Sequence, residues 1–191
     1  MARMFSSKKG LGIGQVFIFM IAALSFSLIM IFGYKMIQGF INGGNEVAFV
    51  QFKNDLESSV RKIYTEYGSV RTLDYHLPSS FSKICFLDLG YDAPLEELER
   101  QQAQLSLQNP IASGVWQDLA STPAQSRYEA TDENVFLTPP AKVKIKIHRI
   151  SIYDPDTGER KVSGFLCKEI KDGTFSLTLI GKGDHTGLLN R

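Results

Sequence analysis

The side chains that most often carry out chemistry are few in this chain and lie far apart. Its two cysteines, Cys85 and Cys167, fall in segments with a strand-like pattern and form no C-x-x-C pair. The three histidines, His76, His148 and His185, show no spacing to these cysteines that is typical of a zinc site. A cysteine–histidine nucleophilic pair has no local support either. We therefore expect no catalytic residue, no metal and no cofactor, and we expect that the protein is not an enzyme.

Two short motifs resemble ligand-binding loops only in part. The stretch DPDTGE (154–159) offers oxygen ligands for calcium but lacks the length and the closing glutamate of a twelve-residue calcium loop, so we predict a hairpin turn. The stretch GKGDHTG (181–187) carries glycines and a lysine, but no helix follows to present its amides to a phosphate. We interpret this second stretch as a flexible tail.

The two cysteines leave two alternatives open. If the domain lies outside the cell, a disulfide between Cys85 and Cys167 is allowed by the oxidising compartment. Closing such a long loop would add roughly 3–5 kcal/mol of stability by the chain-entropy estimate. In the other alternative, both residues are buried free thiols that pack as small apolar side chains.

The elements around these residues begin with a long uncharged run, Gly10 to Tyr34, in the stretch KKGLGIGQVFIFMIAALSFSLIMIFGYK. As a helix, its 25 residues would reach roughly 37 Å, whereas the hydrocarbon core of a bilayer is about 30 Å thick. A cleavable secretory signal has an apolar region of only about 7–15 residues. We therefore predict a transmembrane helix and its continuation over residues 11–42. Its membrane-spanning residues include Leu11, Gln15, Phe19, Leu24, Leu28 and Tyr34.

The flanking charges predict the orientation of this helix. Arg3, Lys8 and Lys9 precede it, within a basic leader of residues 1–10, whereas only Lys35 lies close on the other side. Positively charged flanks stay in the cytoplasm, so we expect a single-pass protein of the cell membrane with its amino terminus inside and its carboxyl-terminal domain outside. The rest of the chain is mildly acidic and lacks the clustered basic charge that nucleic acid requires.

The segment KKGLGIGQVFIFMIA resembles the amino-terminal region of archaeal type IV pilin-like proteins, the archaellins included. The full chain also resembles archaeal single-pass membrane-anchored proteins. The pilin resemblance implies a membrane peptidase that cuts between Gly10 and Leu11, which would make Gln15 the fifth mature residue. Many bacterial pilins place there a glutamate that pairs with a neighbouring subunit, and Gln15 lacks that charge.

A second helix is predicted after Gly43 and Gly44, which we expect to interrupt the first one, with Asn45 as its cap. Apolar residues recur every three or four positions along it, and its opposite face is polar, so we expect it to pack on the domain's own sheet. Gly68 should end it. The apolar residues are Phe49, Phe52, Leu56, Val60, Ile63 and Tyr67, and the polar ones include Lys53, Glu57 and Arg61.

Residues after Gly68 change to the two-residue period of strands. Residues 72–77 alternate as a half-buried strand, and KICFLDL (83–89) is apolar enough for an inner strand. In KVKIKIHRISIYD the apolar residues switch parity, which predicts a bulge or bend near His148. Hairpins are predicted at YDPDTGERKV and around Asp172-Gly173. The fold class is therefore α+β, with a mainly antiparallel sheet in an extracytoplasmic domain of residues 45–191.

Residues 90–132 form a partly helical excursion from this sheet, because three prolines divide them and polar residues dominate. Leu95, Leu98 and Leu105 should form the weak apolar face of a short helix there. Trp116 either pins the excursion to the domain or is an exposed contact for a partner.

Two functions remain open. The first is a membrane-anchored structural protein, as a pilin-like filament subunit or a cell-surface module, with the lipid bilayer and sibling subunits as partners. The alternative is an accessory subunit of a membrane complex that binds a protein partner through the 49–67 helix or Trp116.

Overall fold

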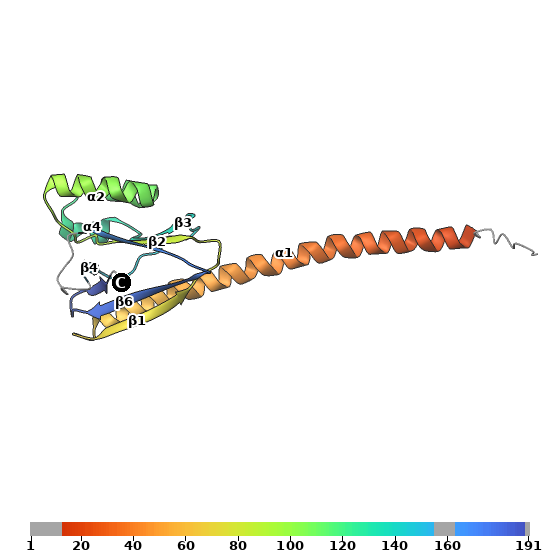
Figure 1. Ribbon diagram of the computed structural model, residues 1–191, viewed down its shortest axis with the longest axis horizontal. Helices are drawn as coiled ribbons and strands as arrows, with labels where there is room; N and C mark the ends of the chain where they lie inside the picture. The colour runs from red at the N-terminus through yellow and green to blue at the C-terminus, as the bar shows by residue number, and fades with distance from the viewer. Residues whose placement is uncertain (1–12, 155–162, 190–191) are drawn as a thin grey trace, which may run out of the picture. The chain divides into compact units, whose positions relative to one another are not determined.

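The computed structural model describes residues 13–154 and 163–189. The chain divides into two compact units at Gly44 and Asn45. Helix α1 (Ile13–Tyr64) supplies all the described residues of the first unit and opens the second (Figure 1). The prediction that Gly43 and Gly44 interrupt the helix is wrong, since α1 continues through both. Each glycine weakens a helix by about 0.5–1 kcal/mol but keeps the backbone N–H that a proline would remove.

The described residues of the second unit form seven strands in two sheets. The first sheet has the order β1-β6-β7-β4, and only its β4–β7 pair is parallel. Its strands are β1 (Val70–His76), β4 (Ile150–Tyr153), β6 (Thr174–Gly181) and β7 (Thr186–Leu189). The second sheet is antiparallel with the order β3-β2-β5, from β3 (Val135–Thr138), β2 (Lys83–Leu87) and β5 (Phe165–Glu169). The α+β class with mainly antiparallel strands is confirmed, although the strands form two sheets.

The main core lies against the second half of α1. The apolar stripe of α1 is buried, as predicted, by side chains from both sheets, such as Ile84 of β2 and Leu177 of β6. The stripe consists of Phe49, Phe52, Leu56, Val60 and Ile63. Tyr67 is not part of it, because α1 ends at Tyr64 and the Tyr67 side chain is 82% exposed.

Among the described residues, three helices cover the other face of the second sheet (Figure 1). They are α2 (Leu95–Gln108), α3 (Pro110–Asp118) and α4 (Ala124–Ala130). Side chains of β2 alternate between the two layers, with Ile84 and Phe86 in the main core and Cys85 and Leu87 beneath the helices. This burial on both faces explains why the sequence of β2 is continuously apolar, and the prediction of an inner strand is confirmed.

The excursion is more helical than its prolines suggested. Pro94 and Pro110 precede or open helices instead of breaking them, and the Asn109 side chain caps α3 by accepting a hydrogen bond from the Ala112 N–H at 3.0 Å. The predicted apolar face of α2 is wrong at Leu95, which is 70% exposed, whereas Leu105 is fully buried.

The turn at Asp172 and Gly173 joins the two sheets. Both residues have positive φ, 52° and 72°, and Lys171 and Thr174 exchange backbone hydrogen bonds across them, as in a two-residue hairpin turn. The strands separate at once, because β5 pairs with β2 whereas β6 pairs with β1 and β7. The turn is therefore confirmed, but the hairpin extends no further than this turn.

The prediction of a flexible tail at residues 181–187 is wrong. Strand β7 lies between β6 and β4, its Leu188 is fully buried, and the Thr186 hydroxyl donates a hydrogen bond to the Val60 carbonyl of α1 at 2.9 Å. Gly181 has no space for a side chain, because a Cβ atom would stand 2.3 Å from the Ile63 carbonyl. The glycines that suggested a tail allow this close packing instead.

The predicted bend at His148 is confirmed. The buried Asn134 side chain accepts a hydrogen bond from the Ile147 N–H at 2.8 Å and donates one to the Ile147 carbonyl at 3.1 Å. The chain then bends at His148 before β4 begins, so Ile147 and Ile150 both reach the core although their parity differs. The predicted hairpin after Tyr153 falls on residues 155–162, outside the described residues.

His148 should make stability depend on pH. Its ring lies 4.4 Å from the Tyr64 ring, and its buried Nδ1 has no hydrogen-bond partner among the described residues. Burial, followed by the charges of Arg149 and Arg61, lowers the pKa of His148 below its usual 6.5. The unfolded chain therefore takes up a proton first as the pH falls, and the folded state loses stability.

We expect His148→Phe to reduce this loss between about pH 7.5 and pH 5, measured as the change in urea midpoint of the detergent-solubilised chain. His76→Gln, at an exposed position of β1, is the matched control and should behave as wild type. An unchanged pH dependence in His148→Phe would contradict the assignment.

Candidate functional site

The apolar segment Gly14–Gln38 is the most extensive candidate for an interaction surface. It has 25 residues, the mean hydropathy of its most apolar 18-residue window is 2.6, and none of that window is buried. The Ser25 and Ser27 hydroxyls donate to carbonyls four residues earlier, at 2.9 Å each, so they need no outside partner. By length and composition, this helix could cross a membrane.

The predicted membrane-spanning residues lie along this segment. Gln15, Phe19, Leu24, Leu28 and Tyr34 are all exposed on α1. At the far end, the Gln38 amide donates a hydrogen bond to the Tyr34 hydroxyl at 2.9 Å. Gly10 and Leu11, the predicted processing site, lie outside the described residues.

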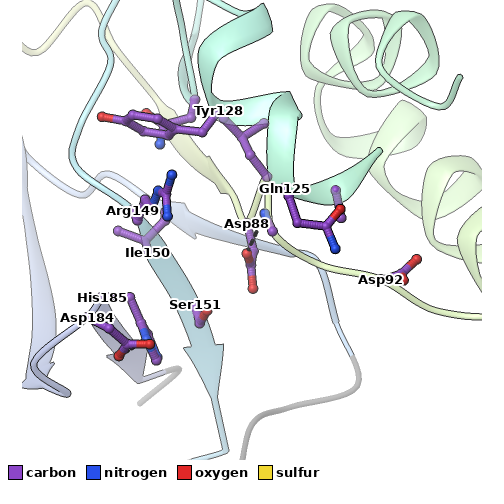
Figure 2. A pocket seen from close by; sticks show the side chains of 13 residues that line it. Asp88, Asp92, Gln125, Tyr128, Arg149, Ile150, Ser151, Asp184 and His185 are labelled. Carbon is purple, nitrogen blue, oxygen red and sulfur yellow. Dashed lines mark hydrogen bonds and ion pairs between the residues drawn. The ribbon is translucent and has the colours of Figure 1, made fainter. Parts of the chain in front are cut away.

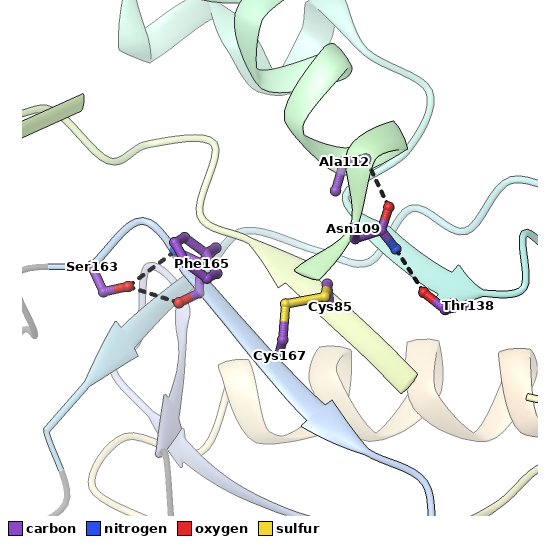
Figure 3. Close-up of a disulfide and its surroundings, with 7 residues drawn as sticks. All are labelled: Cys85, Asn109, Ala112, Thr138, Ser163, Phe165 and Cys167. Carbon is purple, nitrogen blue, oxygen red and sulfur yellow. Dashed lines mark hydrogen bonds between the residues drawn. A yellow bond between two sulfur atoms is a disulfide. The ribbon is translucent and has the colours of Figure 1, made fainter. Parts of the chain in front are cut away.

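Cys85 and Cys167 form a disulfide in the structure (Figure 3). They stand directly opposite each other on β2 and β5, and Cys85 is completely buried beneath the helical layer. The sequence left open a disulfide or two free thiols, and the structure contains the disulfide. The bond closes a long loop, with a sequence separation of 82 residues.

Loss of this bond should destabilise the domain strongly. For a loop of 82 residues, the chain-entropy model predicts that the Cys85→Ala/Cys167→Ala variant loses about 4–5 kcal/mol in its free energy of unfolding. Urea unfolding of the detergent-solubilised chain measures this loss. A reductant should lower the midpoint of the wild type and leave the double variant unchanged, and equal midpoints for both proteins without reductant would contradict the prediction.

Trp116 pins the helical layer to the second sheet. The half-buried indole makes edge contacts with Tyr91 and Phe165, at ring-centroid distances of 6.3 and 6.1 Å. It also covers Gly164, where a Cβ atom would stand 2.3 Å from the indole. The structure therefore places Trp116 in the packing alternative that the sequence left open.

A buried polar network accompanies this contact and was missed by the sequence analysis. The Gln101 amide donates to the Tyr91 hydroxyl at 2.9 Å and accepts from the Gly164 N–H at 2.7 Å. The Arg127 guanidinium donates to the Tyr91 carbonyl at 2.8 Å. No local pattern distinguishes these residues from the surface polar residues around them, because their burial depends on distant parts of the chain.

Gly164→Ala should displace the indole and destabilise the domain by about 1–3 kcal/mol, the usual cost of overpacking. Trp116 is the single tryptophan, so its fluorescence during urea unfolding reports both the changed environment and the stability. Gly114→Ala in α3, where no atom lies within 4 Å of the added Cβ, is the matched control and should be neutral or stabilising. A wild-type emission spectrum in Gly164→Ala would show that the contact is not made.

A polar pocket of about 350 Å³ lies where the end of β2, helix α4 and the start of β4 meet (Figure 2). Asp88 and Ser151 are buried in its lining, and Asp92, Arg149 and Asp184 are exposed. The Asp88 carboxylate accepts a hydrogen bond from the Gly90 N–H at 3.0 Å, so it also holds the turn after β2.

His185, which also lines this pocket, is held from both sides. Its Nδ1 lies 2.6 Å from an Asp184 carboxylate oxygen, and its Nε2 lies 2.7 Å from the Tyr153 hydroxyl. If Nδ1 donates to Asp184, Nε2 accepts from Tyr153. The imidazole then has no free lone pair for a bound molecule. This arrangement favours a role in holding strands β4 and β7 together over general-base catalysis.

Among residues 13–154 and 163–189, no three histidine, cysteine, aspartate or glutamate side chains gather in a way that could hold a metal ion. Comparison with known proteins adds no relative: no family model matches the chain, and no curated protein or solved structure is significantly similar to it.

Proposed function

We propose that this protein is a membrane-anchored structural protein with an extracytoplasmic α+β domain. The observation that carries the proposal is the apolar segment Gly14–Gln38, whose apolar side chains lie exposed in the described structure. Exposed apolar side chains such as Phe17, Ile29 and Phe32, each more than 60% exposed, are stabilised by lipid or by sibling helices and not by water.

The disulfide supports an extracytoplasmic location for the domain. Disulfides form and persist in oxidising compartments and are rare in the cytosol. The basic residues Arg3, Lys8 and Lys9 before the apolar segment favour the same orientation, with the amino terminus inside.

A pilin-like role is the form of this proposal that we favour. The resemblance of residues 8–22 to archaeal pilin-like proteins implies a helix that serves both as a membrane stem and as a core element of the domain. In support of this, α1 runs through both units, and its later residues lie in the core. The accessory-subunit alternative has less support. The apolar stripe of α1 and Trp116, which it would use as contacts, are packed within the domain itself.

Membrane retention tests the proposal. We expect the wild-type chain to sediment with membranes and to need detergent for release, because its apolar segment lies in the bilayer. Charged residues near the bilayer centre cost several kcal/mol, so Leu24→Arg/Leu28→Arg should shift the chain to the soluble or degraded fraction. Leu107→Arg, at an 88% exposed position of α2, is the control and should stay with the membrane. A wild-type chain that is soluble without detergent would refute the anchor.

The same membranes also test the processing and the orientation. Intact mass should correspond to a chain that begins at Leu11, and a protease added to intact cells should reach the domain. Retention of residues 1–10 would favour a plain signal anchor over a pilin-like subunit, and a protected domain would contradict the proposed orientation.

A further inference from the structure

The outer edge of β1 is open in the described structure. Strand β1 ends the order of the first sheet, and β6 is its one partner among the described residues. The Leu77 N–H donates a hydrogen bond to the Gly173 carbonyl, and the Gly181 N–H donates one to the Ser69 carbonyl. The backbone N–H and C=O groups of the odd-numbered residues of β1 therefore point toward β6. The backbone N–H and C=O groups of Val70, Thr72, Asp74 and His76 therefore point away from the sheet.

A groove of about 430 Å³ runs beside this edge. One wall is the flank of α1 with Gln51, Asp55 and Ser59, and the other is formed by residues 73–76 of β1. No residue of β6 lines the groove, so it lies on the outer side of β1. An extended peptide placed here would meet both the open backbone groups and the polar flank of α1.

The Tyr75 hydroxyl could form a polar contact with such a peptide. Tyr75 lines the groove and is only 4% exposed, yet its hydroxyl has no hydrogen-bond partner among the described residues. A buried hydroxyl that is left unpaired destabilises the folded state. Burial raises the pKa of the phenol, the neighbouring Ser59 side chain lowers it as the group placed to hydrogen-bond the ionised oxygen, and the Asp55 carboxylate raises it further. The hydroxyl is therefore neutral at pH 7 and can accept a hydrogen bond.

The carboxylate beside this hydroxyl indicates which kind of side chain could bind here. The Asp55 carboxylate acts on the Tyr75 hydroxyl, and it lies exposed on the same wall of the groove. A carboxylate and a phenol oxygen together suit an ammonium or guanidinium group, which has only donors to offer. We propose that a peptide strand of a partner protein pairs with the open edge of β1. A lysine or arginine side chain of this strand binds Asp55 and Tyr75.

This proposal goes beyond the proposed function and does not depend on the membrane anchor. The groove lies entirely within the second unit, and peptide binding can be measured whether or not the apolar segment sits in a bilayer. Failure of the membrane-retention test would therefore leave the groove unaffected, and failure of peptide binding would leave the anchor unaffected.

The test uses the full chain in detergent and a fluorescent seven-residue peptide, acetyl-Thr-Val-Thr-Lys-Thr-Val-Thr-amide, matched in length to β1. We expect saturable binding by fluorescence anisotropy, weakened about tenfold or more when glutamate replaces the lysine. Asp55→Asn and Tyr75→Phe should each weaken binding of the lysine peptide by about tenfold. Tyr75→Phe should leave the urea midpoint unchanged or higher, because the hydroxyl it removes is unpaired.

Thr72→Pro removes an outward N–H without breaking a β1–β6 backbone bond and should abolish binding. Glu99→Gln, at an exposed position of α2, is the control and should bind as wild type. Absent binding, equal affinity for the glutamate peptide, or binding indifferent to Asp55→Asn and Tyr75→Phe would each overturn the proposal. Self-association that Thr72→Pro abolishes, without peptide binding, would assign the edge to a second copy of the chain and overturn it as well.

Discussion

The burial of one face of α1 between the two sheets is the interaction on which the domain depends. Phe52, Leu56 and Val60 have almost no exposed surface, and both sheets contribute side chains to the core around them. A turn with positive φ joins the sheets directly at Asp172 and Gly173, and α1 and both sheets contribute side chains to one core. The same helix carries the apolar segment, which makes α1 the element that the fold and the proposed function share.

The second sheet extends this core into a second layer. Strand β2 sends alternate side chains to α1 and to the helices of residues 90–132, and the disulfide ties it to β5 on the helical side. The excursion is thus an integral layer of the domain, held by Trp116 over Gly164 and by the Gln101 network. A covalent bond and a close-packed layer both oppose unfolding of the domain.

The polar side chains that line the pocket at Asp88 and the groove at Tyr75 differ in their hydrogen bonding. Asp88 and His185 line a pocket, but each has hydrogen bonds that support nearby backbone or strands. The Tyr75 hydroxyl is different, since it is buried beside an open strand edge without a partner among the described residues. The open strand edge beside this hydroxyl is why the peptide site is proposed here and not at the pocket of Asp88 and His185.

The sequence by itself determined the features that depend on local periodicity. The length of the apolar run, the stripe of α1, the inner strand around Cys85 and the bend at His148 all follow from which side chains repeat at 3.6 or 2 residues. Only the tertiary structure decided which strands pair, that β7 enters the middle of a sheet, that α1 passes Gly43 and Gly44, and that Cys85 meets Cys167. These outcomes depend on contacts between residues far apart in the chain, and such contacts leave no periodic signal in a single sequence.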